Sequence, residues 1–285
     1  MREKRPGGSR RAGVPEAGGR QRSRRRIIPR EHGAWAMMLV PFAAGAALGG
    51  FRLPGILSLA GALFMFLAQP ALSAWLVPGR RARADAREPF PAAAGALFAA
   101  ALLIFLWLLI IRDLYGLLWL GLAAALLSVA HGRLRSRHPR SQAAELAGVA
   151  TLSLAGPLAY YAGSGVLNAA AGWLWFLSAG YFAISVFQVR LKVTAAARRA
   201  GNWRRRSIHA RRTVAYLIIL WAALAVLAAA ARIPAAALLA YAPASVYVLL
   251  GFRTLGRRMS LKREGVSQSL LALAFCLLLI AAYRA

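Results

Sequence analysis

Nine apolar segments divide this chain, and its basic residues gather in alternate gaps between them. Of the 37 Lys and Arg residues, 33 lie in the N-terminal stretch and in every second gap. Short basic loops stay on the cytoplasmic side of a membrane, so this alternation is the positive-inside signature. The sequence therefore predicts an all-α, polytopic transmembrane bundle of nine helices, with its N-terminus in the cytoplasm and its C-terminus outside.

Each apolar segment is close to the length that a membrane-spanning helix requires. About 20 residues cross the roughly 30 Å of hydrocarbon as a helix. Lipid offers no partner to the backbone polar groups of an irregular segment, so helices are expected throughout. The predicted spans are Trp35–Phe51, Pro54–Val77, Pro91–Ile111, Leu114–His131, Leu146–Gly163, Ala169–Gln188, Thr213–Ala231, Ala235–Phe252 and Ser267–Tyr283.

Composition supports a membrane setting and indicates the partners. The apolar fraction is 60%, above the roughly 45–50% of soluble domains. The net charge is +29, but the cations follow the loops, so anionic phospholipids are the expected partners and nucleic acid is not. We expect a disordered basic cytoplasmic tail over residues 1–26, too polar to fold. A nine-helix transmembrane domain over residues 27–285, in the bacterial inner membrane, follows it.

Missing residue types disfavour several classes of function. No charged residue lies in the middle of a predicted span, where ion-coupled transporters usually place a carboxylate. Motifs for a phosphate-binding loop, a nucleophile elbow or a metalloprotease are absent. The single cysteine, Cys276, excludes an internal disulfide, and the four histidines lack metal-ligand spacing. We expect no metal site and no cofactor.

The densest polar group beside a span is Arg30-Glu31-His32, at the cytoplasmic mouth of the first segment. A carboxylate there favours the helix dipole, which is a structural reading that needs no ligand. The alternative is a ligand-binding site, because three ionisable side chains in a row are more than a helix cap requires. Ionisable residues at membrane depth are functional candidates by default.

Four further candidates lie in or beside other spans. Gln69 and Gln188 are polar side chains in predicted spans, where they either hydrogen-bond between helices or contact a ligand. Arg190 and Lys192 open a basic loop that extends to Arg212. Guanidinium groups pair with phosphate, so a diphosphate or a phospholipid head group is one reading of this loop. Nonspecific attraction to an anionic leaflet is the other.

The run Pro29-Arg30-Glu31-His32-Gly33-Ala34-Trp35-Ala36-Met37, continued by Val40-Pro41, resembles the opening signature of the YwiC-like family. This is a family of uncharacterised bacterial integral membrane proteins. The resemblance extends over about residues 27–285 and implies a membrane location.

A more distant resemblance is to the UbiA-type prenyltransferases, which have nine helices and cytoplasmic active loops. It lies in Glu145-Leu146-Ala147-Gly148 and in Gly156-Pro157-Leu158-Ala159. It implies a UbiA-like bundle, but the two Asp-rich motifs that hold magnesium and the prenyl diphosphate in that family are not matched. After the second span only Asp85 and Glu88 are present, out of pattern, and the loop after the sixth span has no carboxylate.

The leading functional hypothesis is a UbiA-like bundle without the magnesium motifs that binds a lipid-like or isoprenoid molecule from the cytoplasmic side. The first alternative is a metal-independent or degenerate prenyltransferase, in which Arg190, Lys192 and the arginines at 204–206 replace magnesium at the diphosphate. The second alternative is a permease or channel. Whether the chain is an enzyme stays open at this stage.

Overall fold

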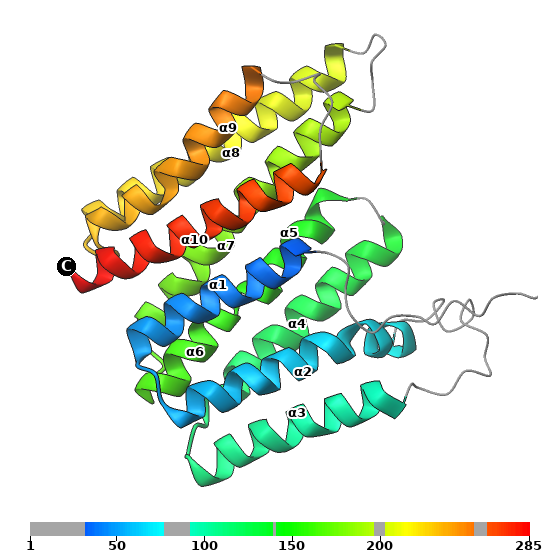
Figure 1. Ribbon diagram of the computed structural model, residues 1–285, viewed down its shortest axis with the longest axis vertical. Coiled ribbons are helices and arrows are strands. Elements are labelled where there is room, and N and C mark those ends of the chain that lie inside the picture. Colours follow the sequence, from blue (N-terminus) through cyan, green and yellow to red (C-terminus); the bar gives the residue numbers. More distant parts are fainter. Residues whose placement is uncertain (1–31, 77–91, 139–140, 197–202, 254–260) are drawn as a thin grey trace, which may run out of the picture.

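The computed structural model describes residues 32–76, 92–138, 141–196, 203–253 and 261–285, which form helices and contain no strand (Figure 1). The all-α prediction is therefore confirmed. In chain order the elements are α1 (His32–Gly49), α2 (Leu53–Leu76), α3 (Ala92–Ile111), α4 (Gly116–Arg137), α5 (Gln142–Ser153), α6 (Ala155–Ser164), α7 (Ala169–Ala196), α8 (Trp203–Ala229), the 3₁₀-helix η1 (Ala235–Tyr241), α9 (Ala242–Arg253) and α10 (Leu261–Arg284).

Two of the nine predicted spans are divided, each next to a proline. α5 ends at Ser153 and α6 begins two residues later. Pro157 has no N–H, and its ring clashes with the carbonyl four residues earlier, which belongs to Ser153. Pro243 has the same effect at the junction where η1 ends and α9 begins. Counting each divided pair as one pass, the nine predicted spans match the helices of the structure.

Successive passes run in opposite directions, so the helix ends that border the basic stretches of the sequence lie at one end of the bundle. We call this the basic end: α1, α3, α5, α8 and α10 begin there, and α2, α4, α7 and α9 end there (Figure 1). The short connections and the C-terminus lie at the opposite end. Six of the described helices are long and apolar enough to cross a membrane, which is compatible with a multi-pass membrane protein.

Several helices extend beyond the predicted apolar segments, and they do so at the basic end. α7 continues from Gln188 to Ala196, and α10 begins at Leu261 instead of Ser267. α4 and α8 are extended in the same sense. Ala, Lys, Arg and Glu favour helices, and long cationic side chains can reach water from a helix whose stem is still in an apolar setting. Residues predicted to be in loops therefore lie on helix surfaces.

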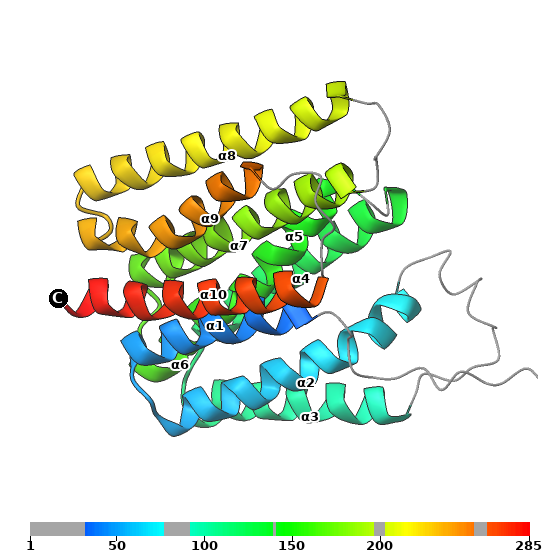
Figure 2. The ribbon, with the colours of Figure 1, turned by 45° about the horizontal axis from the view of Figure 1, so that its top comes forward.

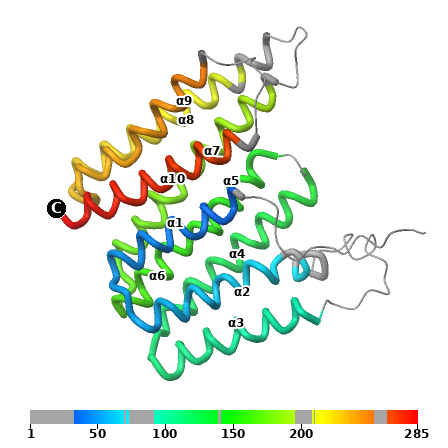
Figure 3. Tube along the Cα trace, viewed as in Figure 1, coloured from blue at the N-terminus to red at the C-terminus, as the bar shows by residue number. Residues whose placement is uncertain are grey.

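α1 is central, with α6 and α10 as its main neighbours (Figure 3). α8 and α9 form one side of the bundle, and α2 and α3 form the other (Figure 2). The main core lies around α7, η1 and α10, where the ring of Tyr181 stacks on Phe275 with centroids 4.0 Å apart. Large apolar side chains on α3, α4 and α8 point outward, as expected of surfaces that face lipid.

The apolar part of the Pro29–Pro41 motif fixes α1 in place. Trp35 meets the ring of Phe66 on α2 edge to face, with centroids 5.2 Å apart. Met38 and Phe42 are buried in the same small core, against Ala159 of α6. Trp35 of the motif and its neighbours Met38 and Phe42 are thus explained by packing.

Candidate functional site

A largely buried ion pair at the basic end joins α7 to α10. The Lys192 ammonium lies 2.7 Å from Oε2 of Glu264, and the two side chains are 14% and 11% exposed. The hydroxyl of Tyr247 on α9 donates to the same carboxylate oxygen at 3.1 Å. Lys192 also lies 4.6 Å from the centre of the Tyr247 ring, which adds a cation–π contact. Three helices therefore meet at one carboxylate.

Amide and hydroxyl groups extend this contact into the bundle. Gln268 donates from Nε2 to Oε1 of Gln188 at 2.8 Å and to Oε1 of Glu264 at 3.3 Å. Ser185 donates to Oε1 of Gln268 at 2.8 Å. We call these six residues the polar cluster: Ser185, Gln188, Lys192, Tyr247, Glu264 and Gln268.

Helical spacing explains why these side chains converge. Ser185, Gln188 and Lys192 recur at three and four residues, so they share one face of α7. Glu264 and Gln268 are four apart and share one face of α10. The polar cluster lies toward the basic end of the helix segments Ala169–Thr194, Ala235–Phe252 and Arg263–Arg284, each long and apolar enough to span a membrane.

One donor in the polar cluster has no acceptor. Gln188 is 2% exposed, and its Nε2 makes no hydrogen bond. A buried donor left in this state costs about 1–3 kcal/mol. Gly251 of α9 lies beside it: a Cβ at that glycine would stand 3.6 Å from Gln188 Nε2 and 3.6 Å from Lys192 Cε. The open donor is thus directed to a place where α9 presents no side chain.

Arg190 forms a second ion pair, between α7 and α5. Its Nε and Nη2 donate to the two carboxylate oxygens of Glu145 at 2.7 and 2.9 Å. The side chains are 22% and 47% exposed, so this pair lies closer to the surface than that of Lys192. Arg190 and Lys192, two of the cations named as diphosphate ligands, therefore have carboxylate partners, and a diphosphate there would have to compete with Glu145 and Glu264.

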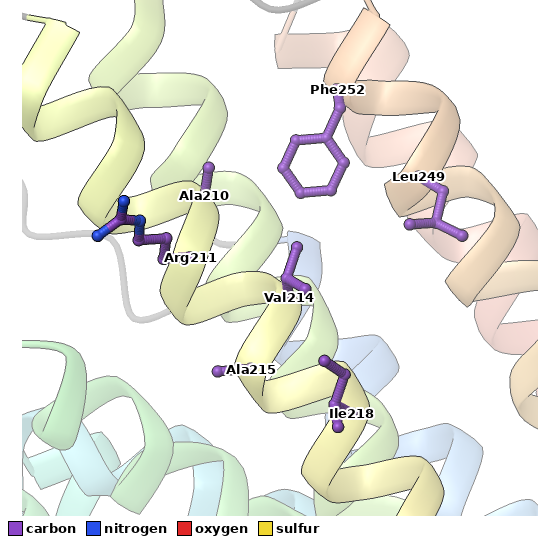
Figure 4. Close-up of a pocket in the computed structure, with 7 residues that line it drawn as sticks. All are labelled: Ala210, Arg211, Val214, Ala215, Ile218, Leu249 and Phe252. Atoms are coloured by element: carbon purple, nitrogen blue, oxygen red, sulfur yellow. The ribbon is translucent and has the colours of Figure 1, made fainter.

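An apolar groove lies between α8 and α9 at the same end of the bundle. Its volume is about 490 Å³, and it is lined by Ala210, Arg211, Val214, Ala215, Ile218, Leu249 and Phe252. Phe252 and Leu249 lie across from Val214 and Ile218, whereas the guanidinium of Arg211 is directed away from Phe252 along the flank of α8 (Figure 4). The groove is open to the surroundings of the bundle.

The structure brings together some of the predicted site residues. Gln188 and Lys192 belong to the polar cluster, and Arg190 lies between them in the sequence but on another face of α7. Gln69 is half-buried on α2, which packs against α3 and α6. Arg30 and Glu31 lie outside the described residues, as do the tail 1–26, Asp85 and Glu88.

Two further predictions concern residues of which only the backbone is described. His32 begins α1, and the arginines at 204–206 lie on the first turns of α8. Their side chains are outside the described part of the structure.

Sequence reasoning missed Ser185, Tyr247, Glu264 and Gln268 as members of the site. The available signal was the spacing of four between Glu264 and Gln268, in a chain with only eight acidic residues. It was missed because the last span was expected to begin at Ser267, which placed Glu264 in a loop. Within the described ranges, no group of three or more His, Cys, Asp or Glu residues could hold a metal ion.

Comparison with known proteins finds a similarity that includes residues 28–160. Residues 28–160 match the family model described as YwiC-like protein. The uncharacterized protein YwiC of Bacillus subtilis (strain 168) is 29% identical over 168 residues, which is 58% of this chain. The alignment spans 66% of that relative. No solved structure matches the chain. The resemblance predicted from the motif at residues 29–41 is therefore confirmed over residues 28–160, where this chain is similar to the YwiC-like family.

Proposed function

We propose that this protein is an integral membrane protein that binds a lipid-like or isoprenoid molecule between its helices, near the polar cluster. The observation that supports the proposal is the open donor of Gln188. Polar groups at this depth are normally paired, because lipid offers no acceptor. A ligand oxygen beside Gly251 would accept from Gln188 Nε2 and would remove the cost of leaving it unpaired.

The charges of the polar cluster indicate the kind of oxygen. Lys192 and Glu264 cancel each other at 2.7 Å, so the polar cluster offers donors without a free positive charge. A neutral carbonyl or hydroxyl oxygen suits such a site better than a phosphate, because a phosphate would displace Glu264 and leave its carboxylate unpaired. We therefore expect a lipid-like molecule whose polar part is neutral.

The test compares molecules that copurify with the detergent-extracted full-length protein, measured by mass spectrometry. Gln188→Leu removes the open donor and keeps a similar volume. Gln69→Leu is the matched control, because Gln69 lies on α2, outside the polar cluster. We expect a non-phospholipid species that is retained by the unaltered protein and by Gln69→Leu, and lost from Gln188→Leu. Equal recovery from all three proteins would contradict the proposal.

The orientation in the membrane is part of the proposal. We place the basic end in the cytoplasm and the C-terminus outside, in the bacterial inner membrane, because 33 of 37 Lys and Arg residues flank the basic end in the sequence. Reporter fusions at the two termini test this, since an odd number of passes requires opposite locations. Finding both termini in one compartment would rule it out.

A permease is the second candidate, and the Lys192–Glu264 pair favours it. The pair lies near the ends of two helix segments that are long and apolar enough to span a membrane, and ionisable residues within a membrane bundle often mark transport pathways. Gradient-driven uptake into proteoliposomes that is lost in Glu264→Gln would support this reading. The transferase alternative is tested by turnover of a labelled prenyl diphosphate in membranes, with and without a chelator; no product in either condition removes it.

A further inference from the structure

We propose that the groove between α8 and α9 binds an anionic phospholipid, with an acyl chain on its apolar walls and the phosphate at Arg211. This site is separate from the polar cluster, and the inference does not rest on the ligand proposed there.

The walls of the groove suit a hydrocarbon chain. Val214 and Ile218, one turn apart on α8, face Leu249 and Phe252 of α9 (Figure 4). The volume of about 490 Å³ falls within the roughly 300–1,000 Å³ of ligand pockets. Because the groove is open to the side, a lipid could enter it from the bilayer without passing through the bundle.

The depth of the groove matches the level of a lipid head group. The apolar run of α8 begins at Thr213, directly after Arg211 and Arg212, and that of α9 ends at Phe252, directly before Arg253. Arg211, Val214 and Phe252 line the groove, so the groove lies where the apolar run begins on α8 and ends on α9. Arg211 is exposed at this boundary. Its stem lines the groove, and its long side chain can place the guanidinium at the phosphate level.

Charge selects an anionic lipid over a zwitterionic one. Residues 189–212 contain nine Lys and Arg and no Asp or Glu. α8 starts with three consecutive arginines and has no acidic residue in its first turn, so their charge adds to the positive end of the helix dipole. Among the described residues, no carboxylate pairs with Arg211. An anionic head group would offset this excess, and Arg can bind phosphate with two parallel hydrogen bonds.

The test is native mass spectrometry of the full-length protein titrated with phosphatidylglycerol or with phosphatidylcholine of the same acyl chains. Arg211→Ala removes the proposed phosphate ligand. Arg212→Ala is the matched control, since it removes the same charge at the next position, which does not line the groove. We expect Arg211→Ala to weaken phosphatidylglycerol binding about tenfold, as the loss of one charge-assisted contact predicts, and Arg212→Ala to weaken it less than threefold.

A second pair of variants tests the apolar wall. Val214→Trp fills the groove and should reduce the binding of both lipids, whereas Ile219→Trp, on an exposed part of α8 outside the groove, should not. Arg211→Lys keeps the charge and should keep most of the preference. Equal effects of the two alanine variants, equal binding of the two lipids by the unaltered protein, or full binding by Val214→Trp would each overturn the inference.

Discussion

Replacing Gly45 by alanine should weaken the contact between α1 and α6. A Cβ at this position would meet the backbone of α6: the carbonyl oxygen and carbon of Gly156, the latter at 2.9 Å, and the nitrogen of Tyr160 at 3.1 Å. Backbone atoms cannot rotate away as side chains can, so the two helices must move apart. Gly49 approaches the backbone of Tyr160 in the same way. Small residues that allow such approach are a main source of helix association in lipid.

The magnitude follows from two opposing terms. Overpacking costs about 1–3 kcal/mol, and alanine is favoured over glycine inside a helix by up to about 1 kcal/mol. Because α1 and α6 make the most extensive helix contact in the fold, we expect the cost to dominate. Gly45→Ala should be destabilised by about 1–2 kcal/mol, and the Gly45→Ala/Gly49→Ala protein by more.

Gly121→Ala on α4 is the matched control. A Cβ there would meet no atom within 4 Å, so only the helix propensity changes and the protein should be equally or slightly more stable. The measurement is denaturant-induced unfolding in one detergent, followed by circular dichroism, for all four proteins. If Gly45→Ala unfolds at the same denaturant concentration as Gly121→Ala, the close approach of α1 and α6 is wrong.

Three further outcomes are expected. Glu264→Gln should lower the free energy of unfolding by about 3 kcal/mol, because it leaves the Lys192 ammonium without its counter-charge. The double variant Glu264→Gln/Lys192→Met should regain part of that loss. No recovery of stability in the double variant would count against the ion pair. Arg190→Ala should lower the free energy of unfolding by less than about 1 kcal/mol, since Glu145 and Arg190 are partly exposed and their attraction is screened. A larger loss in the same assay would mean that this ion pair contributes to stability more than a surface pair does. Deletion of residues 1–26 should leave insertion unchanged in membrane fractionation, and loss of the protein from membranes would refute the tail as a dispensable segment.

The number of passes and their alternation could be predicted from the sequence, because both follow from hydropathy along the chain. The break before α6 could also have been predicted from the sequence, since Pro157 cannot continue an α-helix that includes Ser153, four residues earlier. The ends of α7 and α10 were placed too early. Hydropathy indicates where lipid contact stops, whereas a helix continues as long as its residues favour it. Because the last helix was predicted to begin after Glu264, this residue was not included in the predicted site.

The polar cluster was only half predictable for a different reason. Gln188 and Lys192 stand out on α7, but their partners on α9 and α10 are chosen by tertiary packing. No pattern in the sequence predicts that Gln268 hydrogen-bonds to Gln188, which is 80 residues away. The groove between α8 and α9 was not predicted, because its walls are apolar residues like those of any membrane-facing helix. They line a groove only because α8 and α9 pack side by side.

The position of α1 has a consequence for how the bundle is assembled. This helix is inserted into the membrane first among those described, yet one of its two main neighbours is α10. Arg284 donates to the carbonyl of Ala47, 237 residues earlier, and the Cys276 thiol donates to the carbonyl of Val40. During synthesis the side of α1 that packs against α10 must be covered by lipid or by a chaperone until α10 has been made and inserted. Maturation should therefore be slow relative to insertion, and a ribosome stalled before α10 should leave a protease-sensitive intermediate.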